Sequence, residues 1–179
     1  MKRPLLAIVF VLFSCASTQK PADPPVRAEP VRAAPTTRPT PPEPPAFVDV
    51  GMGDASIRAA VARTSGARGL GLMGRASLAA GEGMIFLYPS PSDHSFWMKG
   101  CLISLDVLYV ADDGTVLGMR TLPPPAPNAT GEEMPRYLSP TPCRIVFEVA
   151  GGGAASRGVK SGSKLRLPDL TALFEASDP

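Results

Sequence analysis

The residues whose types could do chemistry lie mainly between positions 94 and 106. The single histidine, His94, and the single tryptophan, Trp97, fall in this stretch. Lys99 and Asp106 interrupt the otherwise apolar sequence that follows. An indole ring beside a cation and a carboxylate can form a small polar pocket for a sugar or another polar ligand. This stretch is therefore the first candidate for a binding site.

Asp106 is expected to be buried. It shares one face of a predicted strand with Leu108 and Val110, because alternate side chains of a strand point the same way. A buried carboxylate needs a charged or hydrogen-bonding partner, and Lys99 is the nearest cation in the sequence. A ligand site and a structural ion pair both fit this pattern. The residues of the predicted ligand site are Trp97, Lys99, Asp106, Arg68 and Arg75.

Arg68 and Arg75 lie in and after a predicted short helix at residues 64–73. Either arginine could pair with Asp106 or bind an anion near the helix. The alternative for each is a solvated surface arginine.

Asp106 and Glu148 could instead form a pair of carboxyl groups in a hydrolase of envelope glycan or peptide, one as acid and one as base. No nucleophile motif accompanies His94. One histidine with scattered cysteines gives no zinc-ligand spacing. The sequence therefore predicts no metal and no cofactor, and it leaves catalysis undecided.

Cys101 and Cys143 are the two cysteines of the expected folded part, and Cys15 is the third cysteine of the chain. If Cys15 is lipidated, an even pair remains in an oxidising compartment, where disulfides persist. We predict a Cys101–Cys143 disulfide, with two buried free thiols as the alternative.

Residues 1–15 have the pattern of a bacterial lipoprotein signal peptide. Two basic residues precede nine consecutive apolar ones, Leu5 to Phe13, which are too few for a membrane span of about 20 residues. The ending Leu12-Phe13-Ser14-Cys15 resembles a lipobox, whose cysteine carries the lipid. We expect an anchor at the periplasmic side of the outer membrane, or a periplasmic or secreted protein if the peptide is only cleaved.

Residues 16–46 are rich in proline and lack the apolar mass for a core, which predicts a disordered linker. Residues 47–179 contain short apolar runs separated by Gly and Pro, as in strands and turns. The net charge is +2, and no basic stripe suggests nucleic-acid binding. We expect one folded domain, monomeric, with the membrane and an envelope ligand or protein as its partners.

The expected secondary structure is a series of short elements. Strands are predicted at residues 57–62, 84–88, 96–99, 103–111, 115–122, 144–149 and 164–167, with a turn at 112–114. Short helices or turns are predicted at 64–73, 151–157 and 170–176, and a long loop begins at Pro123. This content predicts a mainly β fold, a jelly-roll-like sandwich or partly closed barrel with one or two short helices.

Several separate motifs resemble one family. They are Arg68, Gly71-Leu72-Met73-Gly74-Arg75, Phe96-Trp97-Met98-Lys99, Leu105-Asp106 and Glu148. Their types and order are similar to the bacterial and archaeal "domain of unknown function 192", typified by GLM-x-R and WMKNT-x-x-PLD segments. Gly100-Cys101 replaces the family's Asn-Thr, and Ser104 replaces its Pro. The resemblance implies a mainly β, jelly-roll-like sandwich and implies no activity, because the family is uncharacterised.

The leading functional hypothesis is a membrane-tethered extracytoplasmic domain that binds a small polar ligand or an envelope partner. An envelope hydrolase is the first alternative. A purely structural interaction module, with its interface at the loop of residues 123–142, is the second.

Overall fold

The computed structural model describes residues 46–127, 129, 131 and 134–178. The expected signal peptide, its Cys15 and the expected linker up to residue 45 lie outside the described residues.

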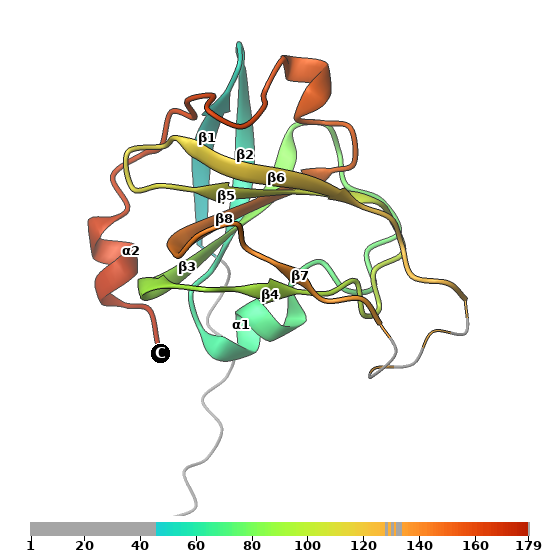
Figure 1. The fold of residues 1–179 in the computed structure, drawn as a ribbon. Helices are drawn as coiled ribbons and strands as arrows, with labels where there is room; N and C mark the ends of the chain where they lie inside the picture. Colours follow the sequence, from blue (N-terminus) through green and yellow to red (C-terminus); the bar gives the residue numbers. More distant parts are fainter. Residues whose placement is uncertain (1–45, 128, 130, 132–133, 179) are drawn as a thin grey trace, which may run out of the picture. The chain divides into compact units, whose positions relative to one another are not determined.

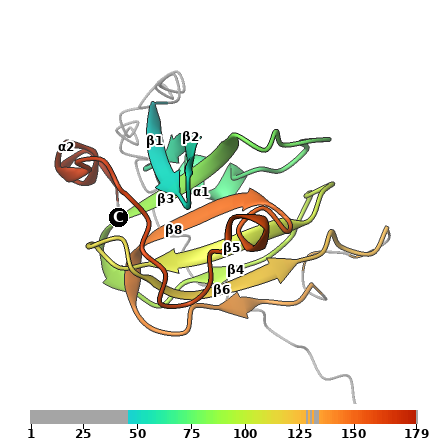
Figure 2. The ribbon, with the colours of Figure 1, turned by 90° about the horizontal axis from the view of Figure 1, so that it is seen from above.

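A six-stranded mixed sheet forms the body of the domain, with strand order β1-β2-β3-β8-β5-β6 (Figure 1). The view from above shows the strands side by side, with β8 between β3 and β5 (Figure 2). The strands are β1 Phe47–Met52, β2 Ala55–Ala62, β3 Glu82–Ser92, β5 Leu105–Val110, β6 Val116–Leu122 and β8 Cys143–Ala150. A separate pair is formed by β4 Ser95–Phe96 and β7 Tyr137–Leu138. The helical elements are α1 Ser65–Leu70, the 3₁₀ turn η2 Ala155–Arg157 and α2 Thr171–Glu175.

Both faces of the sheet are buried, each by a different part of the chain. The first face packs against residues 151–174, which contribute Val159, Leu165 and Leu170 to its core. The second face packs against α1 and the β4–β7 pair, which lie below the sheet in Figure 1. All six residues of β5 are consequently buried, although its sequence is not uniformly apolar. Any polar side chain on β5 or β8 must therefore find a partner inside the domain.

The second face is covered because β2 and β3 are parallel. Parallel neighbours need a crossover connection, and residues 63–81 with α1 provide it. Thr64 begins α1, since its Oγ1 accepts a hydrogen bond from the Ala67 N–H at 3.2 Å. Gly71 ends the helix with a φ of 49°, which favours glycine. The crossover places the Gly71–Arg75 segment over the second face.

The expected mainly β content with two short helices is confirmed. The described residues form no closed barrel, and the parallel β2–β3 pair differs from the all-antiparallel pairing of a jelly roll. The strand expected at residues 96–99 ends at Phe96, because Gly100 turns the chain with a φ of 65°. The strand expected at 164–167 is reduced to two isolated bridges, and β1 was not predicted. The turn at 112–114 is confirmed as the connection of the antiparallel β5–β6 hairpin.

Candidate functional site

Asp106 is fully buried on the first face of the sheet, as its alternation with Leu108 and Val110 predicted. Its carboxylate accepts hydrogen bonds from the Thr121 Oγ1 at 2.7 Å and from the backbone N–H groups of Gly152 and Ala154 at 3.0 and 2.9 Å. Three donors satisfy a buried carboxylate without a counter-ion. Asp106 therefore fixes the turn that follows β8.

The expected pairing of Asp106 with Lys99, Arg68 or Arg75 is wrong. These cations belong to segments that cover the second face, whereas Asp106 points into the first. No ion pair reaches Asp106 from any described residue. The charge of Asp106 is stabilised by backbone dipoles, which residue types alone do not reveal.

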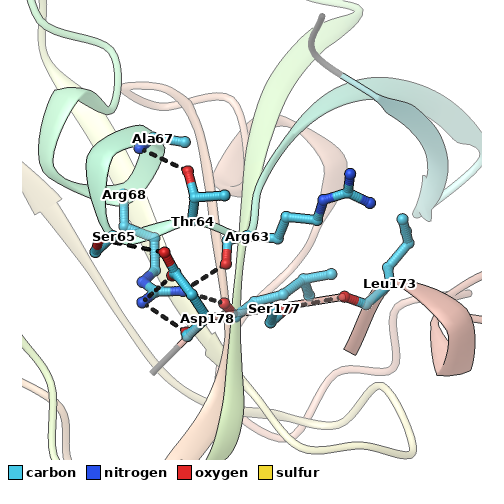
Figure 3. Close-up of polar contacts among 9 residues, drawn as sticks. Arg63, Thr64, Ser65, Ala67, Arg68, Leu173, Ser177 and Asp178 are labelled. Atoms are coloured by element: carbon cyan, nitrogen blue, oxygen red, sulfur yellow. Dashed lines mark hydrogen bonds and ion pairs between the residues drawn. The ribbon is translucent and has the colours of Figure 1, made fainter. Parts of the chain in front are cut away.

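Arg68 is held by contacts to several other parts of the chain. Its guanidinium donates from Nη1 to the carbonyls of Arg63 and Leu87 at 2.7 and 3.1 Å, and from Nη2 to Asp178 (Figure 3). The same group stacks on the ring of Tyr88, 4.8 Å from its centroid. The side chain is only 9% exposed. Arg68 thus links α1, β3 and the C-terminal segment.

Trp97 lies in a half-buried position with two cations against its ring. The Arg136 guanidinium carbon lies 3.8 Å from the ring centroid, and the Lys99 Nζ lies 5.1 Å from it. Both cations are exposed, and neither has an acidic partner among the described residues. Arg136 was missed from the sequence, because it lies 39 positions after Trp97 in the long loop.

The residue before Arg75 and the residue after Lys99 meet in a contact between two loops. The Gly74 N–H donates to the Gly100 carbonyl at 2.8 Å, and the Met73 side chain packs against Gly100. Gly100 has a φ of 65°, a backbone conformation that favours glycine. Arg75 and Lys99 are each adjacent to a bonded glycine. Arg75 is exposed, with no side-chain partner in the part of the chain that is described.

Glu148 lies on the second face, between Met84 of β3 and Val107 of β5. It is 6% exposed, and no described residue forms a hydrogen bond or ion pair with its carboxyl group. Every fully enclosed polar side-chain atom in the described part has a hydrogen-bond partner, so the Glu148 oxygens must retain some solvent contact. Burial raises the pKa of this carboxyl to about 8. Glu148 is therefore mainly a neutral acid at pH 7.

His94 is a buried structural residue. Its ring stacks on Tyr88 with centroids 3.7 Å apart, and its Nε2 lies 2.7 Å from the Cys143 carbonyl oxygen. Burial lowers the pKa of His94, and burial also raises the pKa of Tyr88 to about 12. Both rings are held by these contacts inside the domain.

The expected disulfide is not formed. Cys101 and Cys143 are buried free thiols in the core of the second face. Burial raises the pKa of both thiols, that of Cys101 to about 11, so they are protonated and unreactive. They pack as small apolar side chains.

Within the described ranges, no three His, Cys, Asp or Glu side chains come together as metal ligands. No helix in the same ranges is long and apolar enough to cross a membrane.

Comparisons with known proteins agree with the motifs. The family model of DUF192, described as "Uncharacterized ACR, COG1430", matches residues 47–167. A protein of unknown function from Novosphingobium aromaticivorans is 35% identical, with a TM-score of 0.56 over 67% of this chain and 84% of its own. A candidate transcription regulator from Sinorhizobium meliloti is 26% identical, with a TM-score of 0.55 over 68% and 92%. No curated protein matches the chain. The chain belongs to the uncharacterised DUF192 family.

Proposed function

We propose that this chain is a membrane-tethered extracytoplasmic binding domain with a site for a small anionic ligand around Trp97. The observation that carries the proposal is the pair of exposed cations, Lys99 and Arg136, held against one indole ring without an acidic partner among the described residues. Arg75 is a further exposed cation, and its neighbour Gly74 is hydrogen-bonded to Gly100, the neighbour of Lys99.

The arrangement favours a carboxylate or phosphate joined to a ring. An exposed cation–π contact contributes only about 0.5–1 kcal/mol, so the cations can turn toward an anion at little cost. Charge-assisted hydrogen bonds to an anion are stronger than hydrogen bonds between neutral groups. The Arg136 guanidinium can bind a carboxylate through two parallel hydrogen bonds, as a bidentate pair. The indole would then pack against the apolar part of the ligand.

The tether is supported by residues 1–15, whose short apolar core ends in a lipobox-like sequence at Cys15. The proline-rich residues 16–46 would hold the domain away from the lipid surface. The residue after Cys15 is Ala16 and not an inner-membrane-retaining Asp, which favours an outer-membrane, periplasmic-side location.

Binding is favoured over hydrolysis by the position of the acids. Asp106 is paired in register with Val149, and Glu148 is paired with Val107, so the two side chains project from opposite faces of the sheet. Two carboxyl groups separated by a sheet cannot flank one scissile bond.

Trp97 provides the test, because it is the only tryptophan in the chain and its emission reports on the site. The full-length chain in detergent is titrated with inorganic phosphate, glucuronate and an aromatic dicarboxylate, and with glucose as the neutral comparison. We expect a saturable change in Trp97 emission with at least one anion and no change with glucose. Lys99→Gln and Arg136→Gln should each weaken that binding about tenfold or more, and Lys160→Gln, an exposed lysine elsewhere, should not.

A saturable response that is the same in all three variants would place the anion elsewhere and contradict the proposal. Failure of every anion to change the emission would contradict it as well.

A further inference from the structure

The pocket around Arg68 recognises every polar group of one aspartate, Asp178 (Figure 3). The Asp178 N–H donates to the Arg63 carbonyl at 3.2 Å. Its carbonyl and its Oδ1 accept from the Arg68 Nη2 at 3.0 and 3.1 Å, and its Oδ2 accepts from the Ser65 Oγ at 3.3 Å. The pocket therefore binds both the backbone and the side chain of Asp178, as sites for extended peptides do.

The pocket is organised by contacts other than those to Asp178. The Arg68 Nη1 is held by the carbonyls of Arg63 and Leu87, and its guanidinium stacks on Tyr88. Tyr88 is in turn stacked on His94. These contacts do not involve Asp178, so they would still hold the Arg68 guanidinium in place, with its Nη2 directed at the position of a carboxylate.

The segment that leads to the pocket is anchored in the core of the first face at Leu170, and the stretch beyond Leu170 has no fully buried residue. Helix α2 has five residues, no side-chain cap and no buried residue, and helices of this length are unstable alone. It lies over a recess of about 330 Å³ lined in part by Arg144, Ile145 and Phe174. Leu173 and Phe174 are partly buried against the core of the first face, and the Arg144 guanidinium lies over the Phe174 ring at 3.9 Å. The family match also ends at residue 167, before this segment.

We propose that the Arg68 pocket is a docking site for an extended acidic peptide segment, and that residues 168–178 are a tethered occupant that competes with such a segment. A tethered segment acts at an effective concentration of order millimolar. A free peptide with the same contacts therefore binds poorly while Asp178 occupies the pocket. The partner is a chain that presents an aspartate in extended conformation. Weakening the contacts between Asp178 and Arg68 exposes the site.

The test compares full-length wild-type chain with Asp178→Asn and with Glu175→Gln, a matched loss of one charge in α2 that does not touch Arg68. The probe is a fluorescent peptide with the sequence of residues 168–178 and an amidated end, beside the same peptide carrying Asp178→Asn. Binding is measured by fluorescence anisotropy. Opening of residues 168–178, called the strap below, is measured by hydrogen exchange of the amides of residues 170–178.

We expect Asp178→Asn to speed exchange in the strap and to bind the aspartate peptide at least tenfold more tightly than the wild type or Glu175→Gln. The asparagine peptide should bind each of the three chains at least tenfold more weakly than the aspartate peptide binds Asp178→Asn. The proposal is overturned if Asp178→Asn leaves exchange in the strap unchanged, or if the strap opens and the peptide still binds no better than to the wild type. Equal binding of both peptides overturns it too, since the carboxylate would then not be recognised.

Discussion

Asp106 and Glu148 lie on adjacent strands but on opposite faces of the six-stranded sheet. The two buried acids are consequently stabilised in different ways. Asp106 is surrounded by three hydrogen-bond donors, whereas Glu148 has none among the described residues and holds a proton instead. One acid is held by hydrogen bonds, and the other is buried without them.

Asp106→Asn should destabilise the domain by about 2–4 kcal/mol, because an amide group cannot accept from all three donors and directs its own N–H groups at one of them. Urea unfolding measures the loss. Thr121→Val removes only one of the three donors, from an exposed residue, and should cost about 1 kcal/mol. Wild-type stability in Asp106→Asn together with lost ligand binding would instead make Asp106 a binding residue.

Glu148→Gln should remove a pH dependence of stability. The pKa of Glu148 is raised from 4.5 to about 8 in the folded chain, so between these values the folded state holds a proton that the unfolded state has released. The free energy of unfolding therefore falls as pH rises through this window, by about 1 kcal/mol per pH unit.

Urea unfolding of wild type and Glu148→Gln from pH 5 to 9 gives the difference in their free energies of unfolding at each pH. The lowered pKa of His94 acts in the opposite sense, because its contribution is lost as pH falls below about 6.5, and it cancels in the comparison. Parallel curves for the two chains would show that Glu148 is ionised throughout.

Cys101 and Cys143 should resist alkylation in the native chain and react fully after unfolding. Their thiols are buried, and the pKa of each is raised, so the thiolate is scarce at pH 8. Mass spectrometry of peptides after iodoacetamide treatment, with and without urea, measures both states. A disulfide-linked peptide pair from non-reduced chain would contradict the free thiols.

Cys15→Ala should release the chain from the membrane fraction if Cys15 carries the lipid. Fractionation and labelling with a fatty-acid analogue measure the change, and Ser14→Ala serves as the matched control because it preserves the cysteine. Membrane recovery of Cys15→Ala equal to that of the wild type would contradict the tether.

The local pattern of the sequence predicted five of the six strands of the main sheet, all but β1, and the burial of Asp106. Alternation places Asp106 with Leu108 and Val110, and the structure confirms it. What the pattern could not predict is pairing between distant segments. The donors to Asp106 are backbone groups after β8, and no residue type marks them.

The candidate site was predicted in part for the same reason. Trp97 and Lys99 are neighbours in sequence and contact each other, but Arg136 joins them only through the fold. Glu148 was named from the sequence as a candidate acid or base, and its alternation with Val146 in an apolar strand agrees with its burial. Its lack of a partner is visible only in three dimensions.

The position of β8 has a consequence for synthesis of the chain. Residues 143–150 insert between β3 and β5, which have both left the ribosome long before. Until β8 arrives, the two older strands each carry an open hydrogen-bonding edge and apolar side chains with nothing to cover them. The nascent polypeptide therefore passes through a long interval in which it is prone to self-association, and chain shortened before residue 143 should accumulate as aggregate.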